Sequence, residues 1–216
     1  MTGKTHRVGG MLCALAGYTV LESKGMLISG VNPLLQLTII YPFAIYGSIF
    51  SDLDHNPNSI PSKDIVSVAV NKVLHLSEAT KGPLSVFNAR HRSWQTHSDL
   101  FLFVVIALFG TLLSSMSGTA NSIIIQLVGM GFLLGVISHL ILDMLTPEGI
   151  WCFGLVAFSK VTGKKSTKIR FVPKSKFFAT GGSWEDCVRA FMWFISILLL
   201  VRVIYLMTPY RINFNI

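Results

Sequence analysis

The chain has 216 residues, of which 51% are hydrophobic and only 13% are charged, and its formal net charge is +8. So few charged residues exclude an ordinary soluble domain and an intrinsically disordered chain, and the composition is typical of an integral membrane protein. Three scattered cysteines, Cys13, Cys152 and Cys187, exclude a zinc knuckle and a disulfide framework. We expect residues 1–216 to form a single membrane-embedded domain.

Five apolar runs predict helices that cross the membrane, because a bilayer core requires about 20 apolar residues. The first run has only 14 residues and contains three glycines, so it either crosses or folds back. Its basic start imitates a signal peptide, but no small-residue cleavage site follows, and we expect it to be retained. The sequence therefore predicts an all-α polytopic membrane protein with about five transmembrane helices. The runs are Val8–Leu21, Met26–Phe50, Leu100–Met116, Ser122–Leu145 and Val188–Met207.

The basic residues orient these helices. With five crossings and a cytoplasmic N-terminus, 15 of the 18 lysine and arginine residues fall in cytoplasmic segments, whereas Lys24 and Arg211 fall outside and Arg202 lies within the last run. Cytoplasmic loops are enriched in lysine and arginine, so this asymmetry favours that orientation. It predicts a multi-pass protein of the cell (inner) membrane with every candidate ligand at the cytoplasmic end of a helix.

The first candidate ligand, His6, immediately precedes the first apolar run, where a solvated or headgroup-facing histidine is the alternative. After the second run, Asp52, Asp54 and His55 occupy three of four consecutive positions, and Pro57 then stops the helix. Carboxylate oxygens and imidazole nitrogens are ligands that zinc, manganese and iron accept. An Asx-rich cap and turn would contain the same residue types, so both interpretations stay open.

Residues Asp64–Ala79 carry their apolar side chains on one helical stripe and their polar side chains opposite. This pattern predicts an amphipathic helix that lies on the cytoplasmic leaflet, with membrane lipids as its partners. His75 belongs to this helix, but it has no acidic or histidine neighbour at ligand spacing, and we assign it a structural role.

Two histidines, His91 and His97, precede the third apolar run. Arg92 could bind an anionic group, since a guanidinium matches the oxygens of a phosphate, and Asp99 could orient a neighbouring histidine. The alternative is an ordinary helix N-terminus, capped by one of the hydroxyl residues beside the run.

The fourth apolar run ends with His139 and Asp143. At positions i and i+4 these residues share one helical face, with their Cβ atoms roughly 5–6 Å apart, which suits two ligands of one cation. An ionised aspartate costs about 2.5–3.5 kcal/mol at a bilayer centre, so such residues are usually paired, near a helix end or functional. A capped helix end, with the histidine hydrogen-bonded to a neighbour, is the alternative.

Seven basic residues and no acidic residue lie between Lys160 and Lys176. An ordinary cytoplasmic loop explains most of them, and each would add roughly 1 kcal/mol of attraction to an anionic leaflet, so the loop should gather phosphate-bearing molecules. Within it, Lys168–Pro173 alternates like a short strand. The last apolar run contains no candidate ligand.

Four motifs occur in order along the chain: Thr5-His6-Arg7, Gly47-x-x-x-Ser-Asp-Leu-Asp-His55, His91-Arg-x-x-x-Thr-His-Ser98 and Gly135-x-x-Ser-His-x-x-x-Asp-x-Leu-Thr-Pro-x-Gly149. Together they resemble the YdjM-like family of inner-membrane metal-dependent hydrolases, which is described as LexA-regulated in its namesake. The basic region and the closing span are similar too, so the resemblance covers nearly the whole chain.

The resemblance implies a metal site and hydrolysis of an ester. The family is in turn similar to zinc-dependent phospholipase C and the S1/P1 nucleases, in which a pair like His139 and Asp143 binds zinc. Two departures stand out. Ser51 occupies a position where the family usually has proline, and the interval from His91 to His97 is one residue longer than usual, which leaves open which of the two binds metal.

We therefore predict a membrane-bound, metal-dependent hydrolase of a phosphate ester, with one to three divalent ions, zinc foremost and manganese or iron as alternatives. Asp54 is the predicted bridging ligand or general base, and Arg92 the phosphate clamp. A metal or ion transporter and a non-catalytic membrane scaffold are the rival functions. No specific nucleic-acid partner is predicted, and the substrate and the oligomeric state stay open. The predicted metal ligands are His6, Asp52, His55, His91, His97, His139 and Asp143.

Overall fold

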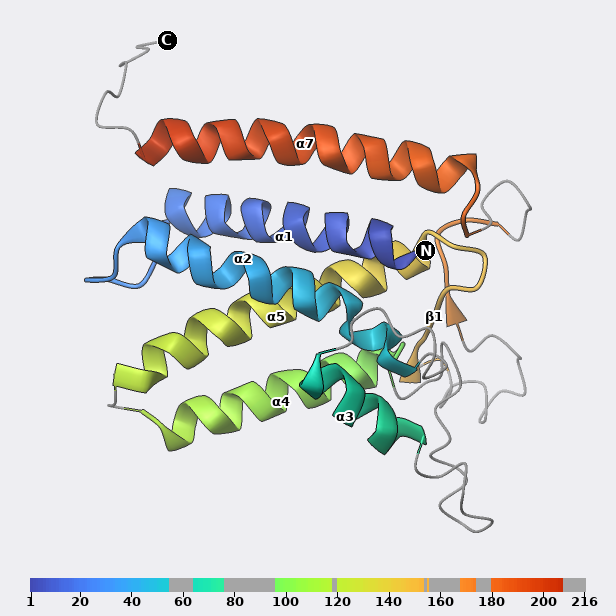
Figure 1. Cartoon of the computed structure of the whole chain (residues 1–216), viewed down its shortest axis with the longest axis horizontal. Helices are drawn as coiled ribbons and strands as arrows, with labels where there is room; N and C mark the ends of the chain where they lie inside the picture. Colours follow the sequence, from blue (N-terminus) through green and yellow to red (C-terminus); the bar gives the residue numbers. More distant parts are fainter. Residues whose placement is uncertain are drawn as a thin grey trace.

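The computed structural model describes residues 1–54, 64–75, 96–117, 120–153, 155, 168–173 and 180–207. Helices dominate this part of the chain, as predicted (Figure 1). They are α1 (Gly3–Ser23), α2 (Pro33–Phe50), the 3-10 turn η1 (Ser51–Asp54), α3 (Ile65–His75), α4 (Asp99–Ser115), α5 (Ala120–Met144) and α7 (Ser183–Met207), with the short strands β1 (Ile150–Trp151) and β2 (Lys168–Ile169).

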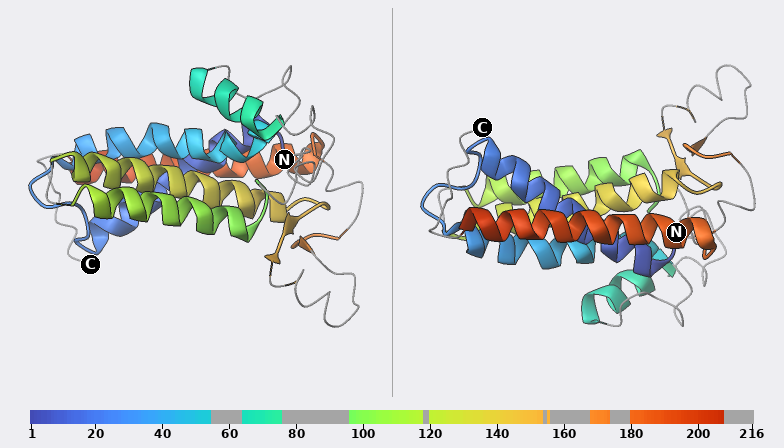
Figure 2. Two further views of the ribbon diagram at one scale, coloured as in Figure 1. Left: turned by 90° about the horizontal axis from the view of Figure 1, so that it is seen from below. Right: turned by 90° about the horizontal axis from the view of Figure 1, so that it is seen from above.

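The long helices form a bundle around α5, as Figures 1 and 2 show. Helix α5 packs against α1, α2 and α4, whereas α7 packs mainly against α1. One apolar cluster joins Tyr18 of α1, Ile40 of α2 and Leu127 of α5, and all three side chains are buried. The segments η1, β1 and β2 lie together at one end of the bundle.

Among the described residues, three helical segments are long and apolar enough to cross a membrane: Pro33–Asp54, Asn121–Met144 and Ser183–Met207. Helix α4 is apolar but shorter. These segments, together with the overall composition, confirm an all-α membrane protein. Helix α1 extends from Gly3 to Ser23, so it is longer than the predicted apolar run and includes His6.

The predicted start of the second helix at Met26 was wrong, because α2 begins at Pro33. Gly25 and Gly30 have φ values of 63° and 77°, a conformation that excludes them from a right-handed helix. The buried Gln36 side chain holds the connecting loop, since its amide accepts from the Ile28 nitrogen and donates to the Ile28 oxygen. Pro33 then occupies the first turn, where its missing N–H is not needed.

The short strand predicted at Lys168–Pro173 is present, but it is limited to Lys168–Ile169. It pairs antiparallel with Ile150–Trp151, which was not predicted. The predicted amphipathic helix is present as α3, and its predicted last turn, residues 76–79, lies outside the described residues.

Glycines allow α2 and α5 to approach each other closely. A Cβ atom on Gly135 would collide with the carbonyl oxygen of Ala44, and one on Gly47 would collide with that of Phe132. Because these obstacles are backbone atoms, they cannot move away without shifting a helix. The two helices can therefore keep their separation only with glycine at these positions.

We predict that Gly135→Ala destabilises the protein by about 1–3 kcal/mol, the usual range for overpacking a tight contact. The free energy of unfolding of the detergent-solubilised protein, followed by circular dichroism, would measure this. Gly110→Ala is the matched control, because no described atom lies within 4 Å of a Cβ there. It should leave stability unchanged or raise it by up to about 1 kcal/mol. Equal effects of the two substitutions would contradict the close-packing explanation.

Candidate metal centre

All of the predicted site residues that the structure describes come together at the end of the bundle where η1 lies. His6 comes from α1, Asp52 and Asp54 from η1, His97 from the segment before α4, and His139 and Asp143 from α5. The exposed fraction of these residues is between 0% and 6%. The remaining predicted residues, His55, His91 and Arg92, lie outside the described residues.

Local structure explains how each segment presents its side chains. His139 and Asp143 share a face of α5 at positions i and i+4, as predicted, with 3.3 Å between His139 Nε2 and Asp143 Oδ2. Asp52 and Asp54 are in the single turn η1 that continues α2. His97 precedes the Ser98 cap of α4, and its carbonyl oxygen accepts a hydrogen bond from the Trp151 nitrogen of β1.

Four potential ligand atoms converge at the centre of this cluster. His97 Nε2 lies 3.1 Å from His139 Nε2 and 3.4 Å from Asp143 Oδ2. Asp52 Oδ1 lies 3.5 Å from His97 Nε2 and 3.9 Å from His139 Nε2. These atoms come from three separate segments of the chain, so only the folded bundle brings them together.

These separations fit a metal ion. Four ligands that surround an ion tetrahedrally at about 2.0–2.1 Å, the length of a zinc–histidine bond, are about 3.3 Å from one another. The three separations among His97 Nε2, His139 Nε2 and Asp143 Oδ2 lie between 3.1 and 3.4 Å, and Asp52 Oδ1 lies 3.5 and 3.9 Å from the two histidine nitrogens. Two imidazole nitrogens and two carboxylate oxygens are also a chemically suitable set of ligands. The residues could therefore hold a metal ion.

Hydrogen bonds at the far nitrogens orient two of the histidine rings. His139 Nδ1 lies 2.6 Å from the carbonyl oxygen of Ser48, which can only accept. His97 Nδ1 lies 3.0 Å from Thr96 Oγ1, which in turn donates to Asp54 Oδ2. Both rings therefore carry a proton on Nδ1 and direct Nε2 to the cluster. Metal-binding histidines are usually held by such outer partners.

This geometry refines the predicted role of Asp54. Its Oδ2 accepts from Thr96 and lies 3.4 Å from His97 Nδ1, on the side of the ring that faces away from the converging atoms. Asp54 is thus placed to orient His97. Asp99, which was expected to orient a histidine, accepts hydrogen bonds from the backbone nitrogens of Leu100 and Phe153.

His6 lies beside the central atoms. Its ring stacks on His139 with 3.8 Å between ring centroids, and its Nε2 is 3.5 Å from Asp143 Oδ1. Neither nitrogen of this buried ring forms a hydrogen bond with a described residue. Asp143 directs Oδ1 to His6 and Oδ2 to the other histidines, so its carboxylate could bridge two ions. Asp143 Oδ1 also lies 2.9 Å from the Met1 nitrogen.

The electrostatic environment favours a cation. Burial lowers the pKa of His97, but the interactions with Asp52 and Asp54 and the charge of Asp143 outweigh burial and raise that pKa to about 9. Without a metal ion, the ring therefore binds a proton at neutral pH. The site attracts positive charge, which a divalent ion would supply in place of the proton.

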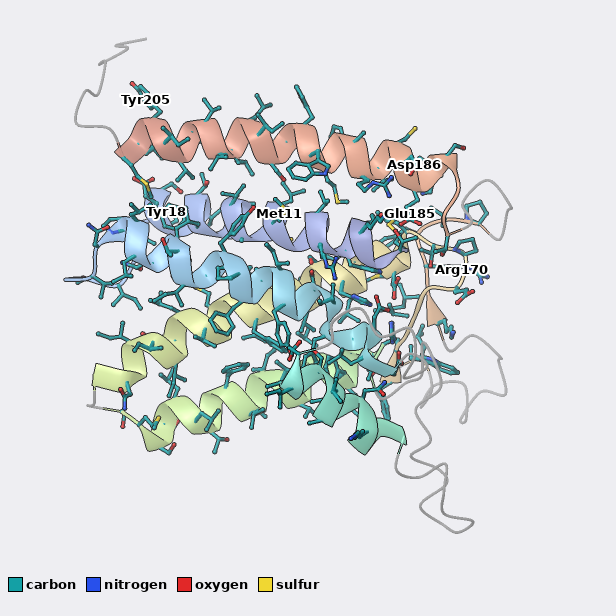
Figure 3. All side chains as sticks on the ribbon, in the orientation of Figure 1. Met11, Tyr18, Arg170, Glu185, Asp186 and Tyr205 are labelled. Carbon is teal, nitrogen blue, oxygen red and sulfur yellow. The ribbon has the colours of Figure 1, made fainter. Side chains whose placement is uncertain are left out.

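Sequence reasoning missed a second polar network that holds the start of α1. The carboxylate of Glu185 accepts hydrogen bonds from the Thr2 nitrogen, from the hydroxyl groups of Thr2 and Thr5, and from the Gly181 nitrogen. Figure 3 shows Glu185 at the start of α7, at the same end of the bundle as Arg170. Thr5 directly precedes His6, so this network fixes the turn that carries it. The signal that could have indicated this network is Glu185 itself, an acidic residue just before the last apolar run.

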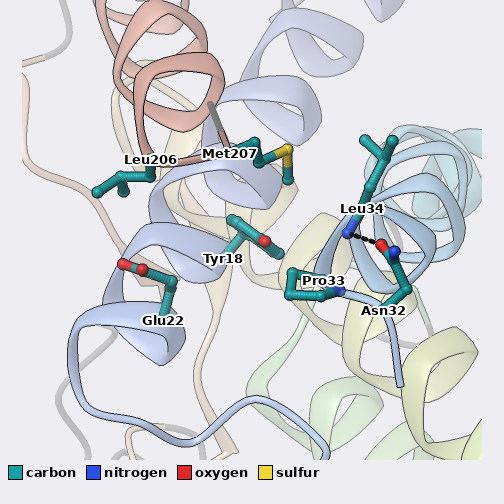
Figure 4. Close-up of a pocket in the computed structure, with 7 residues that line it drawn as sticks. All are labelled: Tyr18, Glu22, Asn32, Pro33, Leu34, Leu206 and Met207. Carbon is teal, nitrogen blue, oxygen red and sulfur yellow. Dashed lines mark hydrogen bonds between the residues drawn. The ribbon is translucent and has the colours of Figure 1, made fainter. Parts of the chain in front are cut away.

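A cavity at the opposite end of the bundle lacks such a set of ligands (Figure 4). It has a volume of about 380 Å³, and Glu22 is the one acidic residue among those that line it. Tyr18 and the last turn of α7 complete its wall. The convergence of histidine and aspartate residues therefore singles out the end near η1 as the candidate site.

Comparison with known proteins gives one result. A family model described as YdjM inner membrane protein matches residues 1–210. No curated protein and no solved structure matches the chain. The match covers all of the motifs that carried the resemblance, whereas the more distant similarity to zinc-dependent phospholipase C and S1/P1 nucleases stays a prediction.

We predict that His139→Ala and Asp143→Asn each lower the affinity for Zn²⁺ by at least 10–100-fold, because loss of a direct ligand should cost at least as much as loss of an outer partner. Competition with a chromogenic chelator would measure this in purified, folded protein. Asp186→Asn is the control, because Asp186 lies at the same end of the bundle but pairs with Arg189. Full Zn²⁺ affinity in folded His139→Ala and Asp143→Asn would support the capped-helix alternative.

The raised pKa of His97 predicts that Zn²⁺ binding releases at least one proton at neutral pH. Since the ion must displace a proton that is held up to about pH 9, affinity should rise by up to about tenfold per pH unit between pH 6 and 8. Calorimetric titration in two buffers of different ionisation enthalpy would count the released protons. Asp186→Asn should leave that count unchanged, and an affinity independent of pH would show that His97 is not a ligand.

Proposed function

We propose that this chain, which belongs to the YdjM inner membrane protein family, is a multi-pass enzyme that uses a divalent metal ion to hydrolyse a phosphate ester at the cytoplasmic face of the membrane. The observation that carries the proposal is the convergence of Asp52, His97, His139 and Asp143. Zinc is the ion we favour, since it accepts imidazole and carboxylate ligands in tetrahedral sites.

The proposal assigns a role to each part of the cluster. Asp52, His97, His139 and Asp143 would hold one ion, and His6 would join Asp143 in holding a second. A divalent ion there would act as a Lewis acid, making a water molecule more acidic and offsetting negative charge on phosphoryl oxygens. Imidazole and carboxylate ligands without cysteine are typical of catalytic zinc sites, whereas structural sites usually include thiolates.

The surrounding residues would keep this arrangement rigid. The Ser48 carbonyl group and the pair formed by Thr96 and Asp54 fix the two rings that face the ion. Asp52 is the least buried member of the cluster, so η1 offers the shortest way for a substrate to reach it. The sequence alone suggests roles for three further residues: Arg92 would bind the phosphate group, and His55 and His91 would be further ligands.

The distribution of basic residues supports a cytoplasmic site. Among the described residues, Lys4, Arg7 and Arg189 belong to the helix ends near the cluster, whereas Lys24 follows the far end of α1. Segments rich in lysine and arginine remain in the cytoplasm.

The position of the cluster along the spans favours an enzyme over a transporter. Asp52 and Asp54 lie at the end of the segment Pro33–Asp54, and Asp143 lies one residue before the end of Asn121–Met144. Transporters bind their substrates near the bilayer midplane. A site at the membrane surface is better placed for a headgroup or a water-soluble ester than for passage across the bilayer.

The test uses sealed vesicles and the impermeant diester bis(p-nitrophenyl) phosphate. We expect Zn²⁺-dependent release of nitrophenol from inverted vesicles and none from right-side-out vesicles. His139→Ala should reduce the rate at least 100-fold, the loss expected of a direct ligand, whereas Asp186→Asn should keep it. Metal binding and Zn²⁺ uptake without hydrolysis would instead identify a transporter, and absence of metal binding would identify a scaffold.

A further inference from the structure

Helix α3 contacts the turn that carries two carboxylates of the metal centre. We propose that α3 lies in the surface of the bilayer with its apolar side chains inserted among the lipids. This placement, the seating of α3, is coupled to η1 by Asn71, so that the membrane surface sets the positions of Asp52 and Asp54. The consequence for metal binding rests on the proposed function, whereas the seating and the contact with η1 do not.

The burial of α3 is the reverse of that of a helix in a water-soluble bundle. Its polar residues Ser67 and Asn71 face the protein and are 0% and 2% exposed. Its apolar residues Ile65 and Val66 are 89% and 57% exposed. An amphipathic helix normally turns its apolar side to the core. The apolar side of α3 therefore faces something other than the described part of the protein.

The position of α3 identifies the bilayer as the occupant of that side. The Tyr46 hydroxyl group lies 3.0 Å from Ser67 Oγ and 3.3 Å from Asp64 Oδ1, so α3 begins beside Tyr46. Tyr46 is eight residues before the end of the span Pro33–Asp54, which is about 12 Å at 1.5 Å per residue. Headgroup layers are about 5–7 Å thick, so the start of α3 lies on the acyl-chain side of the boundary between headgroups and acyl chains.

Surface helices place their apolar side chains about 5–10 Å into this boundary. Figure 2 shows α3 standing off the side of the bundle, next to the end where η1 lies. Ile65 and Val66 are thus available to acyl chains, and the exposed Lys72 can reach anionic headgroups along the same helix. Tyrosine is itself enriched at this level of a membrane.

One hydrogen bond connects α3 to the metal centre. The Asn71 side-chain amide donates to the carbonyl oxygen of Leu53 over 2.5 Å, and both residues are buried. Leu53 lies between Asp52 and Asp54, and η1 is a single turn, so holding its central carbonyl group holds both flanking side chains. Asp64 stabilises the start of α3 by accepting from the nitrogen and hydroxyl groups of Ser67. Asn71 is therefore a positioning residue for Asp52 and Asp54.

The seating is tested with a spin label on Ile65→Cys, after replacement of the three native cysteines, in nanodiscs of phosphatidylcholine and phosphatidylglycerol. We expect the label to be relaxed by lipid-soluble oxygen and protected from an aqueous nickel complex. A label on Glu148→Cys is the control and should show the opposite, because Glu148 is exposed and outside the helices. Access of nickel to position 65, or protection from both reagents as by a bound protein, would overturn the proposal.

The coupling is tested by hydrogen exchange of peptides that contain η1, which requires no metal ion. Asn71→Ala and the isosteric Asn71→Asp should both speed exchange at residues 51–54 and leave α5 unchanged. The double substitution Ile65→Asp and Val66→Asp should do the same by unseating α3, whereas Ile65→Leu with Val66→Leu should not. Unchanged exchange in η1, either in both Asn71 variants or after the double aspartate substitution, would overturn the coupling.

The same variants separate this inference from the proposed function. If both hold, Asn71→Ala should also weaken Zn²⁺ binding by about 10–100-fold, as other losses of outer partners do. If the unmodified protein binds no Zn²⁺ but η1 responds to Asn71 and to the apolar face of α3, the proposed function fails and the coupling stands. If Zn²⁺ binds and Asn71→Ala leaves both its affinity and the exchange of η1 unchanged, the coupling fails alone.

Discussion

The structure depends on the burial of three carboxylates and three imidazoles in contact with one another at the end of an apolar bundle. Buried charges are stable only when they are paired or bound to a metal ion. Here the carboxylate oxygens of Asp143 lie within 3.5 Å of a ring nitrogen of each of the three histidines, His6, His97 and His139. Each of these groups therefore needs the others in place, and a cation among them would satisfy the whole set. The arrangement of the helices can be understood as the scaffold that this cluster requires.

Close packing supplies that scaffold. Ligand atoms 3.1 to 3.5 Å apart on separate segments of the chain tolerate little movement of the helices that position those segments. Gly47 and Gly135 let α2 and α5 meet backbone to backbone, and this contact also places the Ser48 carbonyl group against His139 Nδ1. Distance and ring orientation are thus set by the same interface. A bulkier residue at either glycine would disturb both.

The sequence was most informative where one helix carried the whole signal. His139 and Asp143 could be predicted to lie together because residues i and i+4 share a helical face. The uneven distribution of basic residues predicted that the other ligands lie on the same side of the membrane. The sequence could not predict the hydrogen bond between His139 and the Ser48 carbonyl group, since every residue has a backbone carbonyl group whatever its type. The start of α2 was misplaced because apolar composition outweighed Gly25 and Gly30. Helix α3 was predicted correctly, but its polar face bonds to the bundle, and periodicity alone does not say which face meets the protein.

Burial also limits how a substrate could reach the cluster. Of the described ligands, only Asp52 keeps measurable exposure, and it belongs to the turn whose Leu53 carbonyl group binds Asn71. The most accessible ligand and the contact with α3 are therefore adjacent in one short turn. A change in the seating of α3 would act at the point of entry and, through Asp54 of η1 and Thr96, on the ring of His97. His139 is held by the Ser48 carbonyl group of α2, so its ring can remain in place while η1 responds to the membrane surface.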